Sequence, residues 1–242
     1  MTIPLEIIDL SKTYDSKEAV RNISFKVNEN EIVGILGPNG CGKTTTIGMI
    51  LGLLKPTKGK VLINGIEIEK QRVELLNELN FISPYIELPK KLTVKQNLEV
   101  YGRLYDVKEL GIKIDYLCEK LRLNEFINKI TGELSSGQKN RVSLAKSIIN
   151  DPSVLLLDEP TASLDPETGD FVRSFLEEYQ KEKKASIVLA SHNMSEVERL
   201  CSSVLMMNNG SIIDYGSPKE LIKKHGRENM EEVFLKLNRD QI

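Results

Sequence analysis

Cysteine is scarce in this chain of 242 residues, and its three copies, Cys41, Cys118 and Cys201, are odd in number and widely spaced. Such a set matches neither a disulfide framework nor the paired spacing of a cysteine metal site. Because few cysteines without a pairing pattern suit a reducing compartment, we expect the protein to lie in the cytoplasm.

Positive charge is not in excess either, because 33 lysines and arginines are balanced by 35 acidic residues, which gives a net charge of −2. This balance counts against a dedicated nucleic-acid binder, and we expect no nucleic-acid partner. A local basic patch would still be compatible with it.

Long apolar runs are missing as well. The runs that exist are short, as at residues 154–157, and fall far below the roughly 18 apolar residues that span a bilayer. Glu6 and Asp9 interrupt the N-terminal segment, which therefore does not have the pattern of a secretory signal. If the chain serves a membrane process, we expect the spanning part on a separate chain. The length fits one large α/β domain, or a core with a smaller insert.

A continuously apolar run at residues 32–36 indicates a strand buried on both faces of a parallel sheet, and residues 153–157, with four apolar residues at 154–157, are predicted to be another buried strand. Asn-Gly pairs at residues 64–65 and 209–210 predict hairpin turns. Further predicted strands are residues 24–27, 186–190, 204–207 and 211–215.

Helical spacing is expected in three parts of the chain. The first is a helix at residues 43–54, which Pro56 ends. The second is a helical insert, in which Thr93 is a predicted N-cap and Gln96 completes a capping box. The helices of this insert are predicted at residues 93–104, 116–123 and 137–149. The third part follows the insert, with helices at residues 168–181 and 195–200 and a helical tail at 217–242. Residues 79–85 are interpreted as a loop between core and insert.

A phosphate-binding loop is predicted where the chain matches the pattern G-x-x-x-x-G-K-[ST]. Its members are Gly37, Pro38, Asn39, Gly40, Cys41, Gly42, Lys43, Thr44 and Thr45. Glycine permits conformations that aim backbone N–H groups at a triphosphate, and the next helix adds the positive end of its dipole. We expect Lys43 to reach the β- and γ-phosphates and Thr44 to bind Mg²⁺. A glycine-rich turn without a ligand is the alternative, and the buried strand before the motif and the helix after it favour the phosphate loop.

The Cys41 thiol lies at the predicted start of that helix, a position that can lower a thiol pKa. We expect alkylation of this thiol to inhibit and ATP to protect it. The alternative is an inert thiol that is merely small enough to fit.

Two carboxylates end the predicted strand at residues 153–157. Asp158 is the candidate for holding Mg²⁺, and Glu159 is the candidate for polarising the attacking water. His192 follows the next strand, where it could contact the γ-phosphate and the water. The alternatives are two solvated acids and a surface or satisfied histidine.

Residues 134–138 read Leu-Ser-Ser-Gly-Gln, which alone is a polar turn before a helix with Ser135 or Ser136 as the N-cap. Together with the phosphate loop, the Asp-Glu pair and His192, this turn resembles the signature of ABC transporter nucleotide-binding subunits over about residues 5–217. The resemblance implies an α/β P-loop NTPase fold. It has a RecA-like parallel-sheet core with an N-terminal antiparallel β subdomain, and a helical insert carries the signature. The implied division is residues 1–84 and 151–216 for the core, 85–150 for the insert and 217–242 for a helical tail.

The resemblance also implies a head-to-tail homodimer with two ATP molecules at the seam, working with membrane subunits at the cytoplasmic face of the membrane. In such a dimer the residues that contact the partner's nucleotide are Ser135, Ser136, Gly137, Gln138 and Asp165. Tyr14 matches the aromatic residue that stacks on adenine.

Two positions depart from the family pattern. Ser136 replaces the second signature glycine, which places a Cβ near the nucleotide seam. In the loop before the insert, Pro84 occupies the position of the usual glutamine and Ser83 that of the usual proline. Proline has no side-chain oxygen for Mg²⁺ or water, so Ser83 or Asn80 would have to replace the glutamine.

Three features of the chain distinguish between the classes of ABC protein. The segment between Lys43 and Ser135 holds no sustained heptads, unlike the long coiled coils of chromosome-structure and repair ATPases. The chain carries one ATPase cassette, whereas the soluble translation factors of the superfamily carry two in one chain. The Glu-Glu-Val-Phe-Leu stretch at residues 231–235 is similar to exporter subunits for drugs, lipids or polysaccharides. An importer subunit and a soluble non-transport ATPase are the alternatives.

Overall fold

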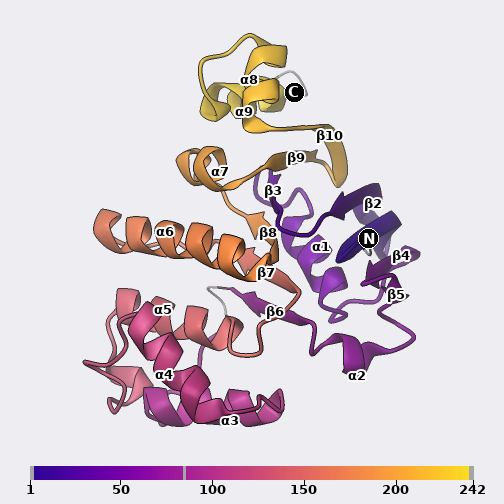
Figure 1. The fold of residues 1–242 in the computed structure, drawn as a ribbon. Helices are drawn as coiled ribbons and strands as arrows, with labels where there is room; N and C mark the ends of the chain where they lie inside the picture. Colours follow the sequence, from indigo (N-terminus) through magenta and orange to yellow (C-terminus); the bar gives the residue numbers. More distant parts are fainter. Residues whose placement is uncertain (1–2, 84–85, 240–242) are drawn as a thin grey trace.

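The computed structural model describes residues 3–83 and 86–239, which form two β-sheets and the helices around them (Figure 1). The first sheet is antiparallel and has the strand order β2-β1-β4-β5. Its strands are β1 (Leu5–Tyr14), β2 (Lys17–Val27), β4 (Lys58–Ile63) and β5 (Ile66–Glu67). Asn64 and Gly65 both have positive φ, 50° and 80°, as a two-residue hairpin between β4 and β5 requires.

The second sheet has six strands in the order β10-β9-β3-β8-β7-β6. Its strands are β3 (Ile32–Leu36), β6 (Leu79–Ile82), β7 (Val154–Asp158), β8 (Ser186–Ala190), β9 (Ser203–Asn208) and β10 (Ser211–Gly216). All neighbours pair in parallel except β10, which is antiparallel to β9. Every residue of β3, β7, β8 and β9 is buried, which is the pattern that the continuous apolar runs predicted. The predicted α/β fold class is confirmed.

Helices cover both faces of the second sheet, and further helices lie beyond it at two ends of the molecule. Figure 1 shows α3, α4 and α5 gathered at one end of the molecule and α8 and α9 at the other. The helices are α1 (Lys43–Ile50), α2 (Arg72–Leu75), α3 (Val94–Leu104), α4 (Leu110–Lys120), α5 (Ser136–Ser147), α6 (Pro166–Lys183), α7 (Met194–Leu200), α8 (Pro218–His225) and α9 (Met230–Arg239), with a 3₁₀ turn at Thr131–Glu133. No helix within residues 3–83 and 86–239 is both long and apolar enough to cross a membrane.

Alternate residues of the second sheet supply two hydrophobic clusters, as strand geometry dictates. Val33, Val188 and Leu156 face α1 and the antiparallel sheet. Leu155 and Leu189 face the opposite cluster, which contains the insert helices and α6. The two clusters fix the second sheet between α1 and the insert, so the loops at its strand ends are held from both sides.

Three local expectations were wrong. Helix α1 ends at Ile50 instead of 54, because Gly52 takes a left-handed conformation (φ 64°) and the N–H groups of residues 53 and 54 both bond the Gly48 carbonyl. Helix α4 lies at residues 110–120 instead of 116–123, and the left-handed conformation of Arg122 (φ 52°) follows directly after its C-cap, Leu121. Residues 79–82, interpreted as loop, are the edge strand β6, which pairs with β7 in parallel.

A partly buried lysine joins the insert to β6. The Lys146 Nζ on α5 donates to Asn80 Oδ1 at 3.0 Å and lies 4.8 Å and 5.3 Å from the ring centroids of Phe81 and Tyr101. Burial lowers the pKa of Lys146 to about 8, because the charged form loses hydration. The folded protein is thus penalised for holding this amine in its charged form.

We expect Lys146→Met to stabilise the protein at pH 7 by roughly 1–3 kcal/mol, because the penalty for the buried charge disappears. The folded-state pKa lies below the unfolded one, so the folded protein binds fewer protons between about pH 8 and 10.5. The wild-type protein should therefore gain stability as the pH rises through this window, and the advantage of the variant should shrink. Urea unfolding of both proteins between pH 7 and 10 measures this.

Lys120→Met is the matched control, because Lys120 on α4 is paired with Glu178 and Glu182. It should lower stability slightly or leave it unchanged. A pH-independent loss of stability in Lys146→Met would show that the amine contributes more through its contacts than it costs through its charge.

Candidate functional site

Four neighbouring strand ends meet at the carboxyl edge of the second sheet. In the order β3-β8-β7-β6, these strands lead into the phosphate loop, His192, Glu159 and Ser83 respectively. Because these strands are parallel, their carboxyl ends lie at one edge, where α/β proteins bind ligands. The fold therefore brings together motifs that are far apart in the sequence.

The phosphate loop depends on glycine at two close approaches. A Cβ on Gly37 would lie 2.3 Å from the Met207 carbonyl oxygen. Gly42 has a φ of 109°, and a Cβ there would lie 2.6 Å from the carbonyl oxygen of Ala19. The loop is thus packed between β2 and β9 so tightly that a side chain at either position would displace backbone.

The start of α1 is open to an anion. Its N-cap is Gly42, and no side chain caps the first turn. The first N–H groups of a helix have no partner within the helix, and they carry the positive end of its dipole. The Lys43 amine adds a full charge and is held at the loop by the carbonyls of Gly37 and Pro38, at 2.6 and 3.1 Å.

A cavity of about 170 Å³ lies beside this helix start. It is lined by Ala19, Asn39, Gly40, Gly42, Lys43, Thr44, Thr45, Asp158 and Glu159. Eight of these nine residues are candidates from the sequence, and Ala19 on β2 is the addition. Ala19 carried no motif that could have marked it, because only its position beside Gly42 brings it to the site.

The Asp158 carboxylate suits a cation. Burial raises the pKa of Asp158, and the neighbouring charge of Glu159 raises it further, while the hydrogen bond from Ser83 and the charge of Lys43 oppose the shift. A buried carboxylate beside a second carboxylate is costly in its ionised form, and a divalent cation would relieve that cost. With the Thr44 hydroxyl in the same cavity, the oxygen ligands present fit Mg²⁺.

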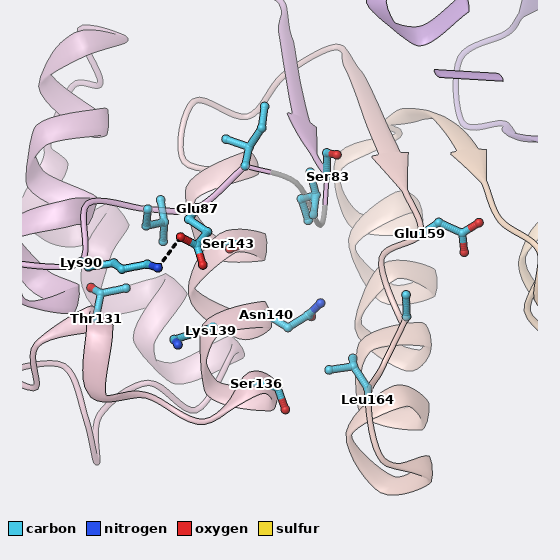
Figure 2. Close-up of a pocket in the computed structure, with 14 residues that line it drawn as sticks. Ser83, Glu87, Lys90, Thr131, Ser136, Lys139, Asn140, Ser143, Glu159 and Leu164 are labelled. Carbon is cyan, nitrogen blue, oxygen red and sulfur yellow. Dashed lines mark ion pairs between the residues drawn. The ribbon is translucent and has the colours of Figure 1, made fainter. Parts of the chain in front are cut away.

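Glu159 lies in a strained turn directly after β7. Its φ is 52°, and its N–H donates to the Ala190 carbonyl at the end of β8 at 2.8 Å. The Oε1 atom of Glu159 lies 2.6 Å from His192 Nδ1. Figure 2 shows the Glu159 carboxylate pointing away from α5. The sequence predicted a role for both residues at the attacking water, and the fold places them in direct contact.

Ser83 is the closer of the two proposed substitutes for the missing glutamine. Its Oγ lies 3.5 Å from Asp158 Oδ2. The Asn80 amide instead donates to Asn150 Oδ1 at 2.8 Å and to the Lys146 carbonyl at 3.3 Å, so it is committed to the insert interface. The assignment of Pro84 to the glutamine position lies outside the described residues.

The signature turn starts α5, with Ser135 rather than Ser136 as the N-cap. The Gln138 N–H donates to Ser135 Oγ at 3.2 Å, and the Ser135 N–H donates to Gln138 Oε1 at 3.1 Å. Gly137 faces Thr168 on α6. Ser136 lines a second cavity of about 220 Å³ between α5 and the core, and Glu159 lines both this cavity and the phosphate cavity (Figure 2). None of the signature residues lines the phosphate cavity of its own chain.

Asp165 and Tyr14 also lie outside the phosphate cavity. Asp165 is the N-cap of α6 and accepts from the Thr168 N–H at 3.0 Å, and this backbone hydrogen bond lowers its pKa. Tyr14 is 43% exposed at the end of β1, with the Lys12 amine 5.0 Å from its ring centroid. An exposed ring is available for stacking.

The expectation that the helix start lowers the pKa of the Cys41 thiol was wrong. The side chain is buried, and burial raises the pKa of the thiol, against a smaller lowering by the charge of Lys43. A buried thiol held in its protonated form is a poor nucleophile, so the alternative of an inert, small residue fits the structure.

Comparison with known proteins gives consistent matches. The family model described as ABC transporter matches residues 20–162, which is more than half of the chain. ABC transporter ATP-binding protein NatA of Bacillus subtilis is 33% identical over 238 residues, 96% of this chain and 96% of that protein. Nod factor export ATP-binding protein I of Rhizobium etli is 36% identical over 220 residues, 90% of this chain and 69% of that protein. A solved structure described as the ATP binding subunit of an ABC transporter superposes with a TM-score of 0.90 at 27% identity, covering 98% of this chain and 100% of that one.

Proposed function

Because the chain belongs to the ABC transporter family, as an ATP-binding subunit that hydrolyses ATP, we propose that it powers export through membrane subunits on separate chains. The observation that carries the proposal is the single cavity in which Lys43, Asp158 and Glu159 meet at an uncapped helix start. Phosphoryl transfer needs positioning and charge stabilisation more than covalent chemistry, and these residues supply both.

Four residues of the cavity, together with His192 beside it, have chemical roles in the proposal. Lys43 and the N–H groups at the start of α1 bind the β- and γ-phosphates of ATP. Thr44 and Asp158 would hold Mg²⁺, which supplies positive charge to the phosphate oxygens when it is bound. Glu159 orients the attacking water and accepts its proton, and His192 fixes the Glu159 carboxylate through their 2.6 Å contact.

A second copy of the chain completes the site in this proposal. The signature residues and Asp165 lie away from the phosphate cavity of their own chain, so a function at a nucleotide requires the nucleotide of another copy. The start of α5 is a helix N-terminus with a glycine and two serine hydroxyls, which suits a phosphate. Tyr14 stacks on the adenine in the same arrangement.

Export rather than import is supported by two likenesses. One relative is named for Nod factor export. The stretch from Glu231 to Leu235 forms part of α9, which docks on α7, and its sequence resembles that of exporter subunits. We place the subunit at the cytoplasmic face of the membrane, held there by its partners, with the insert from α3 to α5 as the contact.

Transport by a reconstituted complex tests this proposal. The tagged chain is expressed in its native host, the membrane proteins that co-purify in detergent are identified by mass spectrometry, and the complex is placed in sealed vesicles. We expect ATP on the side of this subunit to drive substrate away from that side. Movement of substrate toward that side would identify an importer, and an ATPase with no membrane protein attached would identify a soluble family member.

A further inference from the structure

A buried carboxylate behind the site bonds two loops at once. Glu196 on α7 is 0% exposed. Its Oε1 accepts a hydrogen bond from Thr161 Oγ1 at 2.8 Å, and its Oε2 accepts one from Ser191 Oγ at 2.6 Å. Thr161 lies two residues after Glu159, and Ser191 lies directly before His192. One side chain therefore connects the loop after β7 to the loop after β8.

The two loops are joined by side chains at two points. Glu159 contacts His192 at the phosphate cavity, and behind this pair Glu196 accepts hydrogen bonds from both Thr161 and Ser191. The Ser191 hydroxyl is fixed in its role, because its oxygen accepts from the Asn193 N–H at 3.1 Å while its hydrogen is donated to Glu196. A carboxylate only accepts hydrogen bonds, so it matches two hydroxyl donors better than any other side chain of this length.

The two hydrogen-bond partners of Glu196 are uncharged hydroxyls. Burial raises the pKa of Glu196 and the charge of Glu159 adds to the rise, while the hydrogen bonds of Ser191 and Thr161 and the charge of Arg173 lower it by less. A glutamine or a leucine would avoid the cost of burying an acid at a site that only needed to be filled. The acid is thus retained where its cost is high and where its two oxygens hold two catalytic loops.

We infer that Glu196 is a positioning residue for ATP hydrolysis, which sets the separation of Glu159 and His192 by bonding the Thr161 and Ser191 loops together. The inference rests on the proposed roles of Glu159 and His192. It extends to the dimer seam, because the turn that begins at Thr161 leads directly to Asp165, the cap of α6. Loss of the Glu196 bonds removes this connection between the two loops, while the phosphate loop on β3 and α1 stays intact.

Four variants of the full chain test the inference. Glu196→Leu removes both bonds at similar volume, and Thr161→Val and Ser191→Ala remove one bond each. Glu196→Gln keeps the shape, and its amide can still accept from one hydroxyl and donate to the other. ATP affinity, kcat, KM and urea stability are measured for each variant.

Glu196→Leu is expected to lower kcat on the order of ten- to a hundredfold, because displaced catalytic groups cost rate steeply. Its ATP dissociation constant should stay within about threefold of wild type, because no phosphate-binding residue changes. Glu196→Gln should recover kcat to within about threefold of wild type. Because the three residues act as one unit, adding Thr161→Val to Glu196→Leu should lower kcat little further.

Two controls separate the possible outcomes. Glu198→Leu changes the next acid on α7, which is exposed and bonds the Met230 N–H, and it should leave kcat unchanged. Glu159→Gln is assayed in parallel to test the proposed function itself. A folded Glu196→Leu with wild-type kcat would overturn the inference, as would a loss of kcat that only follows a loss of ATP binding. Wild-type turnover by Glu159→Gln would instead overturn the proposed role of Glu159 as the base, on which the inference rests.

Discussion

Glu159→Gln should bind ATP with wild-type affinity and lose turnover by a factor on the order of a hundred or more, because it removes the general base. Glutamine keeps the shape of the side chain and the contact with His192, but it cannot take a proton from water. The pre-hydrolysis complex should therefore accumulate. If a second copy closes over the nucleotide, the variant should elute as a dimer with ATP and as a monomer with ADP.

Light scattering coupled to size exclusion measures this state, and a coupled assay measures turnover. The matched control is Glu167→Gln on the first turn of α6, an acid that lies outside the phosphate cavity. It should hydrolyse ATP at the wild-type rate. Full hydrolysis by Glu159→Gln would remove this residue from the role of base, and a monomer in ATP would count against the trapped dimer.

Lys43→Ala should weaken ATP binding by roughly 2–4 kcal/mol, about 30- to 700-fold in Kd, because a charged partner of the phosphates is lost. The loss should be smaller for ADP than for ATP, since the amine is expected to reach the γ-phosphate. Titration with a fluorescent ATP analogue and with ADP measures both affinities. The effect on kcat at saturating ATP should be large as well, because the same charge stabilises the transition state.

The lysine also bonds the carbonyls of Gly37 and Pro38, so part of the loss could come from the loop itself. Lys43→Met controls for this, because it fills the same space without charge and should bind ATP as weakly as alanine. An unfolding midpoint close to wild type for both variants would assign the loss to the ligand. Wild-type affinity in either variant would contradict the predicted phosphate loop.

Patterns that depend on local physics were predictable from the sequence. The buried strand at residues 32–36 and the capping box of Thr93 and Gln96 occur as expected, because each is specified by adjacent residues. The edge strand β6 was missed, because Asn80 interrupts its apolar pattern and its partner β7 lies more than seventy residues away. The end of α1 was misplaced because Gly52, not Pro56, ends the helix.

The residues of the site likewise fall into those that a sequence motif marks and those that only the fold brings together. The phosphate loop and Asp158 carry motifs that mark them, and the fold brings them to one cavity. Ser83 was a candidate only through a departure from the family pattern and Glu196 carries no motif, because their contacts depend on which loops the sheet order brings together. The lowered pKa expected for the Cys41 thiol was wrong, because the local helix position was weighed without the burial of the side chain. The response of the thiol to alkylation stays a prediction. The division of the chain into core, insert and tail, and the roles across the seam, stay predictions.

The structure of Glu159→Gln crystallised with ATP and Mg²⁺ tests the central claim most directly, through the distance from each γ-phosphate to the nearest serine hydroxyl. The account predicts two nucleotides between two copies of the chain, each with its γ-phosphate about 3 Å from Ser135 Oγ of the partner subunit. Nucleotides enclosed by one copy alone, with residues 135–138 facing solvent, would contradict it.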